Sequence, residues 1–114
     1  MLIGDGSFLY NPVLPFLTFA KDQNLPILVI IFNNNKYEIM RNTHIGWYPE
    51  GVAAQQNVHY GVHIQNPDYS ELALWTGGFG RRVYKPSDLF EAVSVGYQST
   101  ERGNVAIINV MVDE

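Results

Sequence analysis

Two short polar motifs, Gly4-Asp5-Gly6 and Asn33-Asn34, hold the residue types in this chain that could bind a cation and a phosphate together. A carboxylate, a side-chain amide oxygen and backbone carbonyls are the ligands that a hard cation such as Mg²⁺ prefers. Glycines beside Asp5 leave backbone N–H groups accessible to a phosphate at the start of a following helix. Together the two motifs predict a site for Mg²⁺ and a diphosphate.

The chain between the motifs fits one helix followed by one strand. Asn11-Pro12 is a possible helix start, but Pro15 favours a beginning near itself and an end at about Gln23. The continuous apolar run 27–32 is typical of a parallel strand that is covered on both faces. Residues 1–3 read as the end of a preceding strand. Because neighbouring parallel strands end at the same sheet edge, we expect Asp5 and Asn34 to face one cation.

The remaining elements complete an α/β pattern. A capping-box sequence at 68–71 predicts a helix that Gly77-Gly78 closes, and a short strand is expected at 80–84. Pro86 begins a final helix that stops near Gly103, and 105–112 forms the last strand. The order predicts a mostly parallel sheet flanked by helices over residues 1–114. The apolar faces expected for the first and last long helices contain Leu14, Phe16, Leu17, Phe19 and Ala20, and Leu89, Phe90, Val93 and Tyr97.

Residues 42–66 have no clean periodicity, so we expect a long irregular segment that is functional or mobile. His59 and His63 have the spacing of a metal-binding pair on a helix, but Gly61 and the missing helical pattern argue against one. Trp47 and Tyr48 fit either an active-site lid or an ordinary hydrophobic anchor. Surface or hydrogen-bonded roles are expected for the histidines.

Composition excludes several classes of protein. The chain has a formal net charge of −4 with seven Lys and Arg, which argues against a nucleic-acid binder. It has no cysteine, so disulfides and thiolate metal sites are excluded. The longest apolar stretch, 25–32, contains a proline and is too short to span a bilayer. Without a basic N-terminal region or a cleavage site, the cytoplasm is the expected location.

The residues in and around the two motifs resemble those of a known family. Gly4-Asp5-Gly6-Ser7-Phe8, then Asn24-Leu25-Pro26, then Asn33-Asn34-Asn35-Lys36-Tyr37 resembles the cofactor motif of thiamine-diphosphate-dependent enzymes. The chain is similar to the C-terminal diphosphate-binding domain of the acetolactate synthase, benzoylformate decarboxylase and pyruvate decarboxylase group. The short first strand fits this, since we expect the chain to be the C-terminal part of a longer protein and the domain to be partial.

The resemblance implies a role for each matching residue. Mg²⁺ would be bound by the carboxylate of Asp5, the side-chain oxygen of Asn34 and the backbone carbonyl of Lys36. Asn33 would tie the turn together, and Asn35 stands where glycine is frequent, at a position that needs tolerance of left-handed backbone. The implied cofactor-binding set is Gly4, Asp5, Gly6, Ser7, Asn34, Lys36 and Tyr37, and the implied substrate-pocket residues are Ile39 and Met40.

The implied function is to hold the Mg²⁺–diphosphate end of thiamine diphosphate in an enzyme that decarboxylates a 2-oxo acid. Acetolactate-synthase-like ligation of the product to a second carbonyl ranks ahead of simple decarboxylation. A non-catalytic Mg²⁺–phosphate or nucleotide-binding α/β module is the alternative from another class. The family's activating glutamate belongs to another domain, so no catalytic residue is assigned and the isolated chain is expected to be inactive. Expected partners are the upstream domains, the 2-oxo acid and further copies of the chain.

Overall fold

The computed structural model describes residues 1–65 and 67–112. The chain divides into two compact units, which we name the sheet unit (Met1–Asn34 with Pro67–Glu114) and the helical unit (Asn35–Asn66). The sheet unit contains β1 (Leu2–Gly4), α1 (Asp5–Leu9), α2 (Val13–Asp22), β2 (Leu28–Asn33), α5 (Glu71–Leu74), β3 (Phe79–Val83), α6 (Pro86–Glu101) and β4 (Ala106–Met111). The helical unit contains α3 (Glu38–Trp47) and α4 (Val52–Gln56).

The four strands of the described chain form one sheet in the order β1-β2-β4-β3. All three pairings are parallel. Helices lie between successive strands in the sequence, as a parallel sheet requires, because its connections must cross from one end of the sheet to the other. The structure confirms the predicted α/β class and the predicted strand order along the chain.

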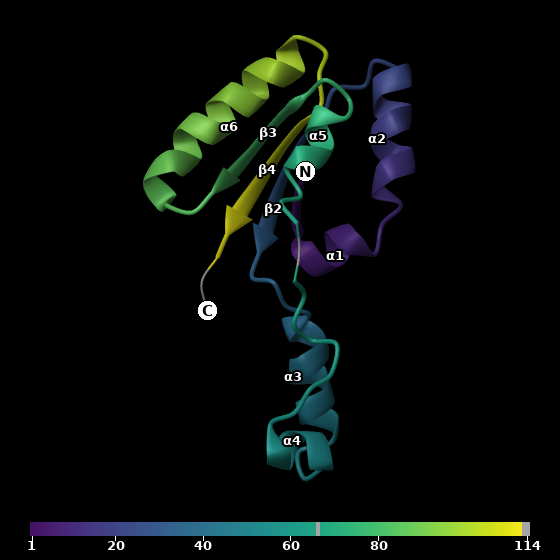
Figure 1. Cartoon of the computed structure of the whole chain (residues 1–114), viewed down its shortest axis with the longest axis vertical. Coiled ribbons are helices and arrows are strands. Elements are labelled where there is room, and N and C mark those ends of the chain that lie inside the picture. Colours follow the sequence, from purple (N-terminus) through teal and green to yellow (C-terminus); the bar gives the residue numbers. More distant parts are fainter. Residues whose placement is uncertain (66, 113–114) are drawn as a thin grey trace. The chain divides into compact units, whose positions relative to one another are not determined.

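Alternating side chains of the central strands build a core on each face of the sheet. Val29, Ile31 and Ile107 pack with residues of α1, α2 and α5 on one face. Ile108 and Val110 pack on the other face, where α6 covers them. This follows from the two-residue period of a strand, which sends neighbouring side chains to opposite faces. Figure 1 shows α2 and α6 on opposite sides of the sheet.

The first helical region differs from the prediction. The chain turns into α1 directly after Gly4, and α2 begins at Val13 rather than near Pro15. Pro15 is compatible with this start because it lies in the first turn, where backbone N–H groups have no partner inside the helix. The Phe16 N–H donates a hydrogen bond to the carbonyl of Pro12 at 3.1 Å, at the start of the helix.

Both long helices bury narrower faces than the sequence predicted. In α6, Phe90 is 83% exposed and Tyr97 is also exposed, whereas Leu89 and Val93 pack near Ala92. In α2 the buried residues are Leu17 and Ala20, and the exposed ones are Leu14, Phe16 and Phe19. A helix that packs against a flat sheet presents only one stripe to it, so apolar residues outside that stripe face outward.

One close approach depends on a glycine. A Cβ atom at Gly80 would lie 2.0 Å from the carbonyl oxygen of Ser70, which is buried just before α5. That separation is far inside van der Waals contact, so only glycine lets β3 pass the start of α5 at this point. Across residues 1–65 and 67–112, no helix is long and apolar enough to cross a membrane. The predicted cytoplasmic location stays a prediction.

Candidate functional site

The two motifs follow neighbouring strand ends. β1 ends at Gly4, which pairs with Phe32 of β2 in parallel register. Asp5 therefore comes one residue after a paired position, and Asn34 comes two residues after the matching position on the next strand. Both residues leave the sheet at the edge formed by the carboxyl ends of its strands. In open α/β sheets, ligands bind outside this edge.

Asp5 is the first residue of α1 and is only 4% exposed. Its Oδ1 accepts a hydrogen bond from the Gly6 N–H at 2.9 Å, while its Oδ2 is buried and has no hydrogen-bond partner. Burying a carboxylate oxygen without a partner costs free energy. A cation or a hydrogen-bond donor beside the Asp5 Oδ2 would remove this cost. The implied contact of the Gly6 N–H with a phosphate stays a prediction.

Two buried amides and a half-buried carboxylate form a chain of hydrogen bonds that starts at the end of β2. The Asn33 Nδ2 donates to the Asn109 Oδ1 at 3.1 Å, and the Asn109 Nδ2 donates to the Asp68 Oδ1 at 3.0 Å. Asp68 Oδ1 also accepts from the Ser70 N–H and hydroxyl. Sequence reasoning expected Asn33 to tie the turn but missed Asn109 and Asp68. The signal was an asparagine in the middle of the apolar strand 105–112.

The backbone turns sharply just beyond Asn34. Asn35 has a φ of +55°, in the left-handed region that asparagine tolerates better than most residues. The structure thus gives Asn35 the left-handed backbone that was expected at this position. The carbonyl of Asn33 accepts a hydrogen bond from the Val112 N–H at 3.0 Å. Asn34 is thus flanked by a fixed strand residue and a tight turn.

In the helical unit, Lys36 and His63 form an antiparallel bridge. Its two hydrogen bonds join Tyr37 to Val62 and Ile64 to Asn35. Lys36 is therefore in a non-hydrogen-bonded pair, and its own carbonyl points away from His63. This orientation fits the implied use of that carbonyl as a ligand, which stays a prediction. His59 and His63 lie outside the helices, so the helical metal pair is rejected, as expected.

The segment 42–66, predicted to be irregular, is partly helical. It contains most of α3 and all of α4, and neither helix has a buried residue. Ile39 is 80% exposed and Met40 is also exposed within this structure, so their implied role toward a substrate stays a prediction. The hydrophobic periodicity of the sequence did not reveal α3, because this helix buries no apolar stripe.

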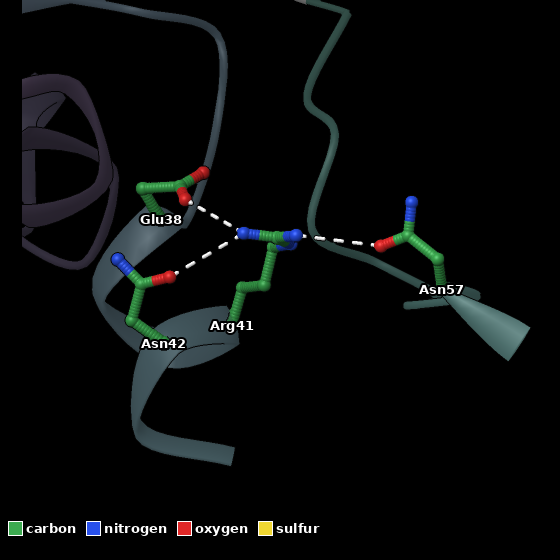
Figure 2. A network of polar contacts seen from close by, with 4 residues as sticks. All are labelled: Glu38, Arg41, Asn42 and Asn57. Atoms are coloured by element: carbon green, nitrogen blue, oxygen red, sulfur yellow. Dashed lines mark hydrogen bonds and ion pairs between the residues drawn. The ribbon is translucent and has the colours of Figure 1, made fainter. Parts of the chain in front are cut away.

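Local polar contacts hold α3 instead, as Figure 2 shows. The guanidinium of Arg41 donates to the Glu38 carboxylate at 3.1 Å, and weaker contacts reach Asn42 at 3.4 Å and Asn57 at 3.3 Å. Glu38 and Arg41 are three residues apart, a spacing that places them side by side on a helix. Asn57 follows α4, so this network joins the two helices of the unit.

Three aromatic rings of the helical unit, those of His44, Tyr48 and His59, form a small cluster. The ring centroid of His44 lies 5.7 Å from that of Tyr48 and 5.9 Å from that of His59, both edge-on. Trp47 and Tyr48 are exposed, so neither anchors a core here, and the lid alternative remains open. The described residues contain no group of three or more His, Cys, Asp or Glu that could hold a metal. The predicted Mg²⁺ site, with a single carboxylate, does not depend on such a group.

Comparison with known proteins agrees with this geometry. Residues 1–110 match the family model described as "Thiamine pyrophosphate enzyme, C-terminal TPP binding domain". Among solved structures, the chain is similar to benzoylformate decarboxylase from Polynucleobacter necessarius, with a TM-score of 0.72 and 19% sequence identity. The match covers 98% of this chain and 19% of that one, and at this identity it shows the fold alone. No curated protein matches the sequence.

Proposed function

Because the chain belongs to the thiamine pyrophosphate enzyme family, as its C-terminal TPP-binding domain, we propose that it holds the cofactor's diphosphate through Mg²⁺ at the carboxyl edge of β1 and β2. The family membership confirms the resemblance read from the sequence. The two residues that the proposal places on the metal within the sheet unit are Asp5 and Asn34. The backbone carbonyl of Lys36, two residues after Asn34, is the third ligand that the resemblance implies.

The observation that carries the proposal is the buried, unpartnered Oδ2 of Asp5. A divalent cation would satisfy this oxygen, and carboxylate and amide oxygens suit Mg²⁺ better than softer metals. The Asp5 Oδ1 is already held by the Gly6 N–H, which fixes the carboxylate's orientation before any metal arrives. A ligand that is oriented in advance loses less entropy on binding.

Each residue has a distinct task in this proposal. The cofactor, when bound, supplies the carbon nucleophile that attacks the carbonyl of a 2-oxo acid. Asp5 and Asn34 neutralise the diphosphate by holding its Mg²⁺. Gly4 and Gly6 would leave room for the diphosphate, Ser7 would offer it a hydroxyl group, and the resemblance implies that Tyr37 would lie beside it. Ile39 and Met40 provide apolar surface for the substrate.

The reaction we propose is decarboxylation of a 2-oxo acid, with acetolactate-synthase-like ligation ranked ahead of release of an aldehyde. The chain spans about a fifth of the length of the benzoylformate decarboxylase that it matches, which supports a need for further domains. Those domains would carry the glutamate that activates the cofactor. On its own, the chain is expected to bind the cofactor without turning over substrate.

We also propose that the chain associates with further copies of itself. Leu2 and Phe90 are more than half exposed. Phe32 is also exposed, on the strand β2 that pairs with the strand of Leu2. Such apolar surface favours association in water. Light scattering is expected to give a dimer or a larger species, and a monomer at high concentration would contradict this part of the proposal.

Calorimetric titration tests the central proposal. Thiamine diphosphate with Mg²⁺ is expected to bind more tightly than ADP with Mg²⁺, and tighter binding of ADP would favour the nucleotide-binding alternative. Asp5→Asn removes the charge but keeps the side-chain size, and is expected to weaken Mg²⁺ binding by about tenfold or more. Asp22→Asn is the matched control, because Asp22 is an exposed acid at the end of α2.

A further inference from the structure

We propose that Asn109 and Asp68 are positioning residues for the metal site, acting through Asn33 to fix the neighbouring ligand Asn34. The proposal rests on the proposed function, since it assigns two further residues to that same site. Neither residue is adjacent in sequence to the Gly4-Asp5-Gly6 or Asn33-Asn34 motif. The structure brings the members together through hydrogen bonds among three side chains. Asn33 is the last residue of β2, Asn109 lies within β4, and Asp68 is half-buried before α5.

The chain of hydrogen bonds has a defined direction. The Asp68 Oδ1 accepts every hydrogen bond it makes here, so it faces the Nδ2 donor of Asn109. The amide of Asn109 then turns its Oδ1 the other way, toward the Nδ2 of Asn33. A single carboxylate thereby sets the orientation of two amides. If either amide rotated by about 180°, two donors or two acceptors would face each other.

Asp68 is itself held from a second direction. Its Oδ1 accepts from the Ser70 N–H at 3.0 Å and from the Ser70 hydroxyl at 2.8 Å. These contacts belong to the turn that leads into α5, and Ser70 is buried. The start of the relay is therefore attached to Ser70, the residue just before α5.

The relay ends at a backbone position that controls Asn34. Asn33 is fully buried, its side chain is bound to β4, and its carbonyl accepts from the Val112 N–H. The next residue but one, Asn35, holds a left-handed turn. Asn34 therefore leaves a pinned strand end and enters a tight turn, so any shift of Asn33 is passed to the Asn34 side chain.

Burial makes the relay sensitive to change. Asn33 and Asn109 are both 0% exposed, so water cannot replace a lost partner. Removing one member leaves a buried polar group unsatisfied, and the strand end must shift to relieve it. Partners that orient metal ligands from behind typically change metal affinity by about 10- to 100-fold when they are removed. Tight control of a ligand's position is what such partners supply.

The test measures Mg²⁺ affinity by calorimetry at saturating thiamine diphosphate, using the full chain. Asn109→Leu keeps the side-chain size but removes the relay, and is expected to weaken Mg²⁺ binding by about 10- to 100-fold. Val83→Ala is the control for lost stability, because Val83 is buried on the opposite face against α6. It is expected to lower the Tm while leaving Mg²⁺ affinity within about twofold of the wild type.

Two outcomes overturn the inference while leaving the proposed function standing. One is unchanged Mg²⁺ affinity in Asn109→Leu. The other is an equal loss of affinity in Val83→Ala at a matched fall in Tm, which would reveal a general effect of stability. If the wild-type chain binds no thiamine diphosphate with Mg²⁺, the proposed function fails and the inference fails with it.

A second pair of variants decides the matter if Asn109→Leu does not fold. Asp68→Leu removes the acceptor, whereas Asp68→Asn keeps an Oδ1 that can accept from Ser70 and Asn109. Mg²⁺ affinity is expected to fall by about tenfold or more in Asp68→Leu and to be largely restored in Asp68→Asn. Equal affinities in the two variants would overturn the relay.

Discussion

In the sheet unit, β4 buries the five consecutive residues 106–110, whereas in the helical unit neither α3 nor α4 buries any. Among the described residues 35–65, Val62 is the buried hydrophobic side chain. The sheet unit is thus held by apolar burial on both faces of its sheet. The helical unit depends on local polar contacts such as the Arg41 network.

The two units are therefore stabilised by different kinds of interaction. Burial of apolar surface is worth about 25 cal/mol per Å², whereas exposed ion pairs contribute well under 1 kcal/mol each in most cases. We therefore expect the sheet unit to be the more stable of the two. Local opening should occur first in the helical unit.

Gly80→Ala is expected to damage the sheet unit most. The new Cβ would lie 2.0 Å from the carbonyl oxygen of Ser70, so β3 or the start of α5 must move. The expected loss is about 3 kcal/mol or more, which corresponds to a fall in Tm of roughly 10 °C or more. Thermal unfolding followed by circular dichroism measures it. A Tm within about 2 °C of the wild type would show that the two segments separate easily.

Ile107→Ala ranks next, because Ile107 is fully buried against α1, α2 and α5. Removing its outer atoms leaves a cavity, with an expected cost of about 2–5 kcal/mol. Val62→Ala in the helical unit is the comparison and is expected to cost less. Urea unfolding gives both values. An equal loss at Val62 would contradict the view that only the sheet unit depends on burial.

Arg41→Lys is expected to act only within the helical unit. Lysine keeps the charge but loses the planar fork that contacts Glu38, Asn42 and Asn57 together. Because these groups are partly exposed, the expected cost is about 0.5 kcal/mol. Hydrogen exchange should become faster in α3 and α4 while β4 is unaffected. Arg102→Lys, at an exposed arginine, is the control; a matching change there would point to a general charge effect.

Gly46→Ala is the only one of these changes that is expected to stabilise the protein. A Cβ at Gly46 meets no atom within 4 Å, and the residue lies inside α3. Alanine there should stabilise the helix by about 0.5–1 kcal/mol. Slower hydrogen exchange in α3 would be the sign of it. Faster exchange would mean that this glycine is needed for the helix's path.

Sequence reasoning succeeded where burial leaves a periodic pattern. The predicted strands at 27–32 and 105–112 lie within one or two residues of β2 and β4, because continuous apolar runs are typical of buried parallel strands. The helix from Pro86 was also found, from its proline start and glycine stop. The α/β class and the strand order along the chain followed from these elements.

Sequence reasoning failed where the structure depends on contacts that leave no local pattern in the sequence. α3 has polar residues on its surface and no buried stripe, so periodicity could not reveal it. Asp68 and Asn109 are 41 positions apart and became partners only through the fold. For the site, the sequence placed the two motifs at neighbouring strand ends, since both follow apolar runs. The relay behind them becomes visible only in the folded structure.

The bridge between Lys36 and His63 has a consequence for protein engineering. Because Lys36 and His63 lie side by side, the segment between them begins and ends at adjacent positions and can be exchanged as one piece. The entropy of closing such a segment depends only weakly on its length, roughly as its logarithm. Replacing the part of it after Met40 by shorter or longer inserts should therefore be tolerated by the fold, while Tyr37, Ile39 and Met40 stay in place for the proposed site.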